Sequence, residues 1–252
     1  MAKTEPHQTE STRDGGETCG QVISPFSLRS LGQAILRIMR KNLALGLLAA
    51  ATFGTAALAA VPPASVWEIG PHIRGKNYSV GMPLRPQETR QGWAFDFPHA
   101  SRAAGHVHYV TFRPGPLTGK SRIKVRYRVT AERGTRFVPQ EQPDEPATVS
   151  LFLQRNGDNW TAKGRYDFYR WYAPPETVQR ISPGVHEITV DLDDPEWISV
   201  AFRPASENPS GFRAALRDTD RIGLVFGSSS LRGHGVYATA PARFELLSFE
   251  LE

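Results

Sequence analysis

Short segments in which apolar and polar residues alternate recur from residue 90 to the C-terminus. The clearest is residues 122–130, RIKVRYRVT, where Ile123, Val125 and Tyr127 point to one side and the basic residues between them point to the other. Alternation with a period of two is typical of a β-strand that buries one face. Gly, Pro, Asn and Asp separate the segments at the intervals expected of a β-sandwich.

Eight segments of this kind predict eight antiparallel strands, the number found in a jelly roll. They cover residues 93–97, 106–112, 122–130, 147–155, 165–172, 185–193, 221–227 and 242–252. Asn156-Gly157 predicts a tight hairpin between the fourth and fifth strands. One helix is expected where Pro209 follows Asn208 and apolar residues recur at helical spacing. We therefore predict an all-β fold, a jelly-roll β-sandwich of about eight antiparallel strands with one short helix.

The N-terminal part is predicted to direct export. Residues 43–58 form an apolar run that is shorter than a membrane span of about twenty residues. Basic residues precede it and Ala57-Leu58-Ala59 follows it, which is typical of a signal peptide. We expect residues 39–59 to be this signal peptide, with cleavage after Ala59, and residues 1–38 to be a disordered leader or an over-extended gene model. The alternative is a cytoplasmic tail on a signal anchor.

The rest of the chain is predicted to be an extended N-terminal segment, residues 60–89, and the β-sandwich domain, residues 90–252. With 40% hydrophobic and 22% charged residues, the composition excludes a disordered chain. The single cysteine, Cys19, precedes the predicted cleavage site, so the mature chain has no disulfide framework and no thiolate chemistry. Cysteine usage and the predicted signal peptide together favour a periplasmic or secreted protein, with no stable membrane span after cleavage.

Charge argues against a nucleic-acid partner. Lys and Arg number 30 against 25 Asp and Glu, a net charge of +5. Phosphate binding requires basic residues gathered on one surface. The most regular basic row, Arg122, Lys124, Arg126 and Arg128, is expected instead to face solvent and to pair across strands with Glu187, Asp191 and Asp193. Binding of an acidic polysaccharide by this row is the alternative.

The order of several segments resembles a known family. The segments are GWAFDFP (92–98), GHVHYVTFRPGPLTGKSRIKVRYRV (105–129), VSLFLQRNGDNW (149–160), ALRDTDRIGLVFGS (215–228) and ARFELLSFELE (242–252). In this order they resemble the galactose-binding-domain-like jelly rolls used by many carbohydrate-binding modules. The resemblance implies a β-sandwich with a carbohydrate ligand and assigns no catalytic residue. The Asp that often precedes the terminal strand beside a bound calcium has no match here, since Ala240-Pro241-Ala242 stands there, so a structural calcium is not expected.

The segment 160–172, WTAKGRYDFYRWY, holds six aromatic residues. As a strand it places Tyr166, Phe168, Arg170 and Tyr172 on one face and Asp167, Tyr169 and Trp171 on the other. We expect one face to pack in the core and the other to form an aromatic platform that stacks on sugar rings. The alternative is that both faces are buried.

The loop 227–239 displays Arg232 and His234 between glycines, and loops at the end of a sandwich often carry ligand contacts. The predicted ligand-binding residues combine this loop with the aromatic segment. They are Trp160, Tyr169, Arg170, Trp171, Arg232 and His234.

His106 and His108 have a spacing that places both rings on one face of a strand, near enough to share a metal. No acidic ligand follows them, because Phe112 and Arg113 occupy that stretch. We therefore predict no metal and no cofactor, and expect strand histidines that are exposed or hydrogen-bonded. No G-x-S-x-G elbow is present and no catalytic residue is assigned.

Together these patterns predict an exported, non-catalytic β-sandwich that binds a carbohydrate or a cell-envelope glycan through an aromatic platform and end loops. One alternative is a polysaccharide lyase or hydrolase on a jelly roll, which would use His106, His108 or Tyr109 with Arg170 as charge stabiliser. The other is a structural envelope protein without a ligand.

Overall fold

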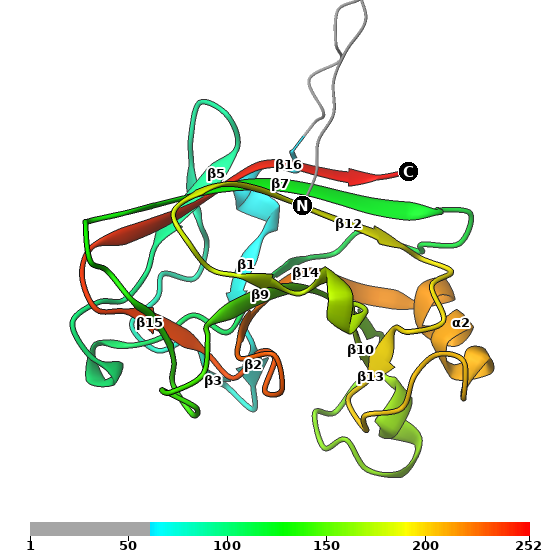
Figure 1. Ribbon diagram of the computed structural model, residues 1–252. Helices are drawn as coiled ribbons and strands as arrows, with labels where there is room; N and C mark the ends of the chain where they lie inside the picture. The colour runs from blue at the N-terminus through cyan, green and yellow to red at the C-terminus, as the bar shows by residue number, and fades with distance from the viewer. Residues whose placement is uncertain (1–60) are drawn as a thin grey trace, which may run out of the picture. The chain divides into compact units, whose positions relative to one another are not determined.

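The computed structural model describes residues 61–252, and the predicted leader and signal peptide lie outside this range. Two antiparallel sheets pack face to face (Figure 1). The seven-stranded sheet runs in the order β1 (Glu68–Gly70), β6 (Tyr109–Phe112), β14 (Thr219–Gly227), β9 (Thr148–Arg155), β10 (Arg170–Tyr172) and β13 (Ile198–Ser199), with β11 (Gln179–Arg180) also paired to β9. The five-stranded sheet runs in the order β12 (Gly184–Asp191), β7 (Arg122–Ala131), β16 (Ala242–Leu251), β5 (Trp93–Asp96) and β4 (Gln87–Glu88).

Shorter elements decorate this sandwich. Two small ribbons pair β2 (His72–Ile73) with β3 (Lys76–Asn77), and β8 (Phe137–Pro139) with β15 (Val236–Ala238). Single 3₁₀ turns occur at η1 (Ala64–Val66), η2 (Arg102–Ala104), η3 (Gly164–Phe168) and η4 (Pro175–Thr177). Within residues 61–252, no helix has the length and apolar character needed to cross a bilayer.

The chain path is that of a jelly roll. The eight principal strands are, in chain order, β5, β6, β7, β9, β10, β12, β14 and β16. Each connection between consecutive members of this set passes from one sheet to the other, except the one between β9 and β10. Each of the eight strands overlaps one of the eight predicted segments, so the all-β jelly-roll sandwich is confirmed.

The predicted helix is also confirmed as α2 (Pro209–Arg217). Asn208 caps its N-terminus, because the side-chain oxygen accepts a hydrogen bond of 2.9 Å from the Gly211 backbone N–H. Phe212 and Ala215 are buried against the seven-stranded sheet and the neighbouring turns. The helix therefore forms where its sequence supplies both a cap and an apolar stripe.

The core between the sheets is rich in aromatic rings. Trp67 and Trp93 lie 4.7 Å apart, and Phe95 stacks on Phe244 at 5.3 Å. All four side chains are buried, and full burial of each such side chain contributes roughly 1.5–3 kcal/mol. Trp67, β1 and β4 precede residue 90, so the sandwich receives part of its core and one strand of each sheet from the segment 61–89.

The five-stranded sheet buries one face only. Along β7, buried residues alternate with more exposed ones, and the Arg and Lys side chains on the outer face form four ion pairs. These pairs are Arg122–Asp191, Lys124–Glu252, Arg126–Glu187 and Arg128–Glu245. The predicted cross-strand pairing is confirmed, although Glu252 and Glu245 take the place predicted for Asp193.

The predicted tight hairpin at Asn156-Gly157 is wrong. The two residues form a turn, but no strand follows it directly. The first residue that pairs again with the end of β9 is Tyr169, whose carbonyl accepts a hydrogen bond of 2.7 Å from the Arg155 N–H. The intervening segment, the 156–169 loop, contains η3, and the returning strand is only β10. Because Gly164–Phe168 forms a 3₁₀ turn, the alternation predicted for residues 165–172 is confined to Arg170–Tyr172.

The seven-stranded sheet is covered on both faces. Every residue of β9 except Arg155 is buried, which requires cover on the outward face as well as on the core face. In Figure 1 the 156–169 loop, the β2–β3 ribbon and β15 lie beyond this sheet on the side away from the five-stranded sheet. The loops and ribbons over this outward face are the part of the sandwich in which cavities can form.

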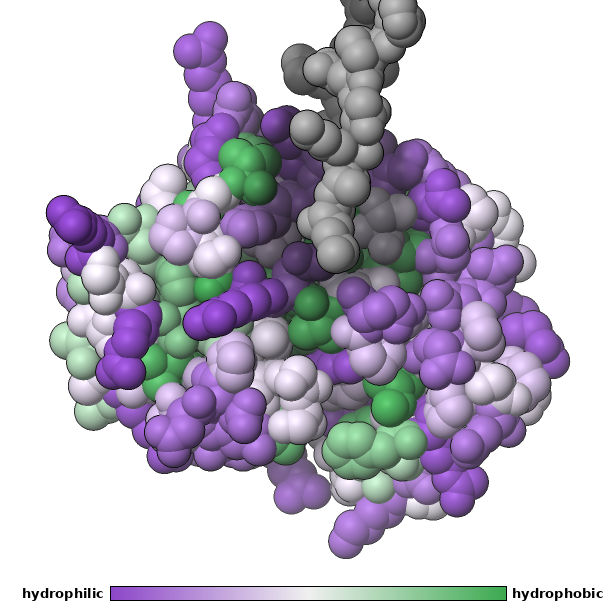
Figure 2. Space-filling view, viewed as in Figure 1, coloured by the Kyte–Doolittle hydropathy of each residue, from purple (hydrophilic) through white to green (hydrophobic). Residues whose placement is uncertain are grey.

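Side chains visible in Figure 2 are mostly hydrophilic, with apolar residues in small separate patches.

Candidate functional site

Two adjoining cavities open on the outward face of the seven-stranded sheet. The first, of about 220 Å³, lies over β1, β6, β9 and the start of β14, and we call it the ion-pair cavity. The second, of about 440 Å³, lies between the β2–β3 ribbon, the segment 102–109 and the loop before β15, and we call it the histidine cavity. Both are lined by Pro71, Tyr109 and Trp160. We refer to the two together as the groove.

A buried aromatic cluster lies beneath the groove, and its rings Tyr109 and Phe152 form the floor of the cavities. Tyr109 of β6, Phe152 of β9 and Tyr172 of β10 point outward from adjacent parts of the sheet and pack with Val225. The Tyr109 and Phe152 rings are 4.9 Å apart, and the hydroxyls of Tyr109 and Tyr172 are hydrogen-bonded at 3.1 Å. Burial raises the pKa of both phenols, so both stay protonated. The floor is thus apolar rings with neutral hydroxyls.

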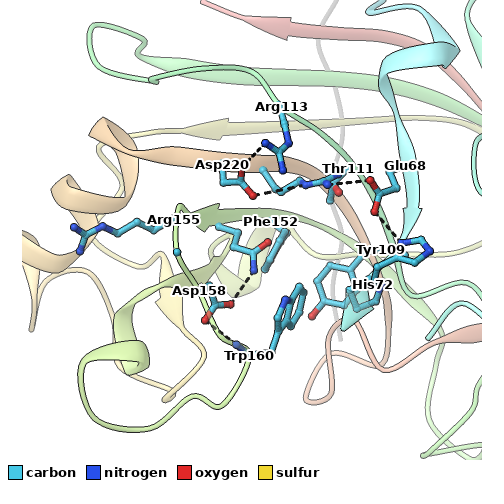
Figure 3. Close-up of a pocket in the computed structure, with 15 residues that line it drawn as sticks. Glu68, His72, Tyr109, Thr111, Arg113, Phe152, Arg155, Asp158, Trp160 and Asp220 are labelled. Atoms are coloured by element: carbon cyan, nitrogen blue, oxygen red, sulfur yellow. Dashed lines mark hydrogen bonds and ion pairs between the residues drawn. The ribbon is translucent and has the colours of Figure 1, made fainter. Parts of the chain in front are cut away.

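Trp160 stands above this floor and separates the two cavities. Its ring is partly buried and meets the Tyr109 ring edge-on at 5.6 Å, as Figure 3 shows. Asp158 holds it there, because one carboxylate oxygen accepts a hydrogen bond of 3.1 Å from the Trp160 N–H and the other accepts one of 2.8 Å from Gln154. The left-handed backbone of Trp160 is therefore fixed by a local turn in the 156–169 loop.

Arg170 joins the loop to the sheet. Its Nε lies 3.0 Å from Asp158 Oδ2, and its guanidinium carbon lies 4.9 Å from the centre of the Trp160 ring. The side-chain exposures of the pair are 9% and 1%, so the ion pair is screened little by solvent. The contact between Nε and the carboxylate lacks hydrogen-bond alignment, which leaves Arg170 held by charge and by the indole face.

Ion pairs line the first cavity. Arg221 donates to Glu68 at 2.9 Å, and the other carboxylate oxygen of Glu68 is 2.9 Å from His72 Nδ1. Burial acts to raise the pKa of Glu68, but Arg221 and His72 outweigh it and the pKa lies below its ordinary value. Arg113 pairs with Asp220 at 3.3 Å. Figure 3 shows Arg113, Asp220 and Glu68 along one side of the cavity, opposite the rings of Tyr109 and Trp160.

A pair of histidines defines the second cavity. His108 Nδ1 is 2.8 Å from the Gly233 carbonyl oxygen, which only accepts, so Nδ1 carries the proton. Burial lowers the pKa of His108 to about 3, so the ring is neutral and its Nε2 is an acceptor. His106 Nδ1, at 2.7 Å from that Nε2, must therefore be the donor. Since burial also lowers the pKa of His106, its Nε2 carries a lone pair.

Two glycines allow the loop before β15 to pass close to these rings. A Cβ at Gly233 would lie 2.4 Å from the Tyr109 hydroxyl, and one at Gly235 would lie 2.6 Å from His108 Nε2. Both residues have positive φ, +77° and +97°. Glycine is needed here for conformation and for space.

The structure brings together three of the six predicted ligand-binding residues. Trp160, Arg170 and His234 all line the histidine cavity, where His234 Nδ1 lies 3.0 Å from Glu141. The predicted placement of Trp171 on an exposed platform is wrong. Its side chain is 0% exposed and packs against Phe212 at 4.9 Å, because β10 turns Arg170 and Tyr172 outward instead.

Tyr169 and Arg232 lie near the groove but outside its lining. Tyr169 stacks under the Arg155 guanidinium at 4.8 Å. Arg232 donates to the Ala173 carbonyl and lines a separate, mainly apolar hollow with Tyr172, Ile198 and Phe202. Burial lowers the pKa of Arg232, which nonetheless stays protonated at neutral pH. These two predicted residues are therefore not brought into contact with Trp160.

Sequence reasoning missed the floor of the groove. The sequence patterns assign Phe152 only to a strand and name Tyr109 only for the alternative lyase, and they do not single out Ser79, whose hydroxyl accepts the His108 N–H at 2.9 Å. One signal was present, since residues 147–153 are apolar or small without alternation, which is typical of a strand covered on both faces.

The histidine pair does not form a metal site with its neighbours. Both ring nitrogens of His108 are used in hydrogen bonds, so neither offers a lone pair to a cation. Among residues 61–252, no three or more His, Cys, Asp and Glu side chains are grouped so that they could hold a metal ion. The site's chemistry as described is that of hydrogen bonds, ion pairs and ring faces.

Comparisons with known proteins add one structural likeness. No protein-family model matches the chain, and no curated protein matches it. Among solved structures, the chain is similar to a carbohydrate-binding module, CBM28, described as specific for non-crystalline cellulose. The two share 11% sequence identity with a TM-score of 0.41, over 79% of this chain and 95% of that one.

Proposed function

We propose that this protein is an exported, non-catalytic β-sandwich that binds a carbohydrate or cell-envelope glycan in the groove. The observation that carries the proposal is Trp160, a partly exposed indole held over an aromatic floor between two polar cavities. Export is supported by the signal-peptide pattern of residues 39–59.

A sugar matches this combination of groups. Its ring presents an apolar C–H face, which packs on an aromatic side chain, and hydroxyls at its edge, which require directional donors and acceptors. The groove supplies both, since Glu68, Arg221 and Asp158 are already fixed by ion pairs and hydrogen bonds. Groups that are fixed before binding lose little conformational entropy when a ligand arrives.

A glycan array followed by calorimetric titration tests the proposal. The protein is expected to bind at least one glycan, and Trp160→Ala is expected to weaken that binding by about five- to tenfold, since stacking on an aromatic ring contributes on the order of 1–1.5 kcal/mol. Tyr237→Ala is the matched control, because Tyr237 is an aromatic residue on β15 that lines neither cavity. Equal affinities for the two variants, or no binding by the parent, would overturn the proposal.

A polysaccharide lyase is the second candidate function, because His106, Tyr109 and Arg170 line one cavity. In such a reaction His106 Nε2 would take the proton next to a sugar carboxylate, and that electron pair would form a carbon–carbon double bond as the glycosidic C–O bond breaks. The Tyr109 hydroxyl would donate a proton to the leaving oxygen. A lyase is expected to produce an increase in ultraviolet absorbance from the new carbon–carbon double bond, whereas a binding protein leaves the absorbance of the glycan unchanged.

A further inference from the structure

The histidine cavity contains a buried cation with unused donors. Arg170 is 7% exposed and lines this cavity. Within residues 61–252, neither terminal nitrogen of its guanidinium donates a hydrogen bond, and its Nε faces Asp158 without alignment. Of its three nitrogens only Nε is fully buried without a hydrogen bond, so the terminal nitrogens, which carry four of the five N–H donors, reach the cavity. An acceptor supplied by a ligand would satisfy the donors that reach the cavity.

The rim of the same cavity is cationic. Lys76 of β3 and Arg102 of η2 line it, and neither forms an ion pair with another described residue. The one acidic residue in the lining is Glu141, which is paired with His234. Arg170 is already paired with Asp158, and the remaining cations Lys76 and Arg102 face one carboxylate here, whereas basic and acidic residues are interleaved in the ion-pair cavity. This balance favours an anionic ligand.

The acceptor at His106 adds a second requirement. The hydrogen bonds through His108 to the Gly233 carbonyl fix His106 with its proton on Nδ1, so Nε2 can only accept. A carboxylate, which has no proton to donate, does not satisfy this nitrogen. A ligand that presents an anionic group and a hydroxyl satisfies Arg170 and His106 together.

We propose that the histidine cavity binds a uronic acid unit of an acidic glycan, with the carboxylate on the terminal nitrogens of Arg170 and a ring hydroxyl donating to His106 Nε2. The planar carboxylate matches the fork of the guanidinium, which binds two oxygens at once. Lys76 and Arg102 attract the charged chain from the rim, and the Trp160 ring borders the bound unit. This inference rests on the proposed function and names the class of glycan.

Titration of the full-length protein with charged glycans and their neutral counterparts tests the inference. Oligogalacturonate, oligoglucuronate and alginate oligomers are each compared with their methyl esters, which keep the sugar and remove the charge. The acid of at least one pair is expected to bind at least tenfold more tightly than its ester, with an affinity that falls as salt is raised. Tight binding of neutral glycans with no preference for any acid would overturn the uronate assignment and leave the proposed function standing. Binding of no glycan on the array or in this panel would overturn both.

Surface variants show whether the preference originates in this cavity. The double variant Lys76→Gln, Arg102→Gln is expected to lower affinity for the acid by about two- to fivefold for each charge, with little effect on the ester. Arg213→Gln is the matched control, since Arg213 is exposed on α2 and lines neither cavity. An equal, small loss of affinity for the acid in the double variant and in Arg213→Gln would show that the anion binds elsewhere and would overturn the inference.

Two variants inside the cavity test the named contacts. Arg170→Gln is expected to lower affinity for the acid by at least about 30-fold, because it removes the buried partner of the carboxylate. His106→Ala is expected to weaken the acid and the ester alike, because both keep the hydroxyl. The near-ultraviolet circular dichroism of each variant establishes that it is folded, and if Arg170→Gln is not, Arg170→Lys replaces it and is expected to lose the two-oxygen contact. A folded Arg170 variant with unchanged affinity would overturn the inference.

Discussion

At the residue scale, the groove depends on side chains whose protonation is set by burial. The hydrogen bond from His106 to His108 exists only while the His108 ring is neutral, because His108 Nε2 accepts it while His108 Nδ1 donates to the Gly233 carbonyl. Tyr109 and Tyr172 stay protonated because burial raises their pKa. The buried histidines and tyrosines of the site are therefore neutral, and the buried charge belongs to the Arg170–Asp158 pair.

His108 makes stability depend on pH. Its pKa is about 3 in the folded protein because of burial, whereas an unfolded histidine titrates near about 6.5. Between these values only the unfolded chain binds the proton, so the free energy of unfolding falls as pH is lowered, by up to about 1.4 kcal/mol per pH unit. Above about pH 6.5 the residue adds no pH dependence.

Denaturant unfolding at pH 6 and pH 5 measures this effect before most carboxylates titrate. His108→Gln is expected to be less stable than the parent at pH 7 and to lose less stability between pH 6 and pH 5. An unchanged slope in the variant would show that His108 is not held neutral.

Glycine at 235 is expected to be required by space as well as by φ. Gly235→Ala places a Cβ 2.6 Å from His108 Nε2, whereas Gly134→Ala, at a similar φ of +86°, meets no atom within 4 Å. Both substitutions carry the conformational cost of about 1–2 kcal/mol, and only Gly235→Ala adds a cost of about 1–3 kcal/mol for overpacking. Equal losses of unfolding free energy would contradict the close approach.

At the element scale, the 156–169 loop is the part of the site that a strand pattern cannot foresee. Six aromatic residues between 160 and 172 fit two faces of a strand, but Gly164–Phe168 forms a 3₁₀ turn and only three residues return to the sheet. Asp158 decides this outcome, because it binds Gln154, the Trp160 N–H and Arg170 at once. Such contacts join residues whose proximity is known only after the loop has folded.

Removal of Asp158 is expected to destabilise the loop and the sheet together. Asp158→Ala leaves Arg170 buried without its counter-charge, and breaking a buried pair in this way costs about 3–5 kcal/mol. Glu187→Ala removes one partner of the Arg126 ion pair, whose side chains are 54% and 72% exposed, and is expected to cost at most about 1 kcal/mol. Chemical denaturation measures both, and similar losses would contradict the burial of the Asp158–Arg170 pair.

The regular elements were predictable because their signals are local. The strand 122–130 alternates perfectly, and the helix after Asn208 carries its own cap. Which face of a short segment points to the core was not predictable, because a change of one residue in register moves every side chain to the other face. Trp171, predicted to contact the ligand, faces the core instead, and Trp160, Arg170 and His234 are the three of the six predicted site residues that meet in one cavity.

At the scale of the whole molecule, the two sheets differ in what covers their outer faces. The five-stranded sheet turns its ion-paired outer face to solvent, while the seven-stranded sheet covers its outer face with loops and an aromatic floor. This asymmetry is what directs the proposed ligand to one side of the sandwich. It follows from the jelly-roll path, which brings β6, β9 and β14 from distant parts of the chain into one sheet.

Tryptophan fluorescence tests the proposed groove most directly. The chain has five tryptophans, and four of them, Trp67, Trp93, Trp171 and Trp197, are fully buried, so a soluble quencher such as acrylamide reaches chiefly Trp160. A glycan bound in the groove is predicted to protect Trp160 from the quencher in a saturable manner, and Trp160→Phe is predicted to abolish the signal. A glycan that binds by calorimetry but leaves quenching of Trp160 unchanged would contradict the placement of the ligand in this groove.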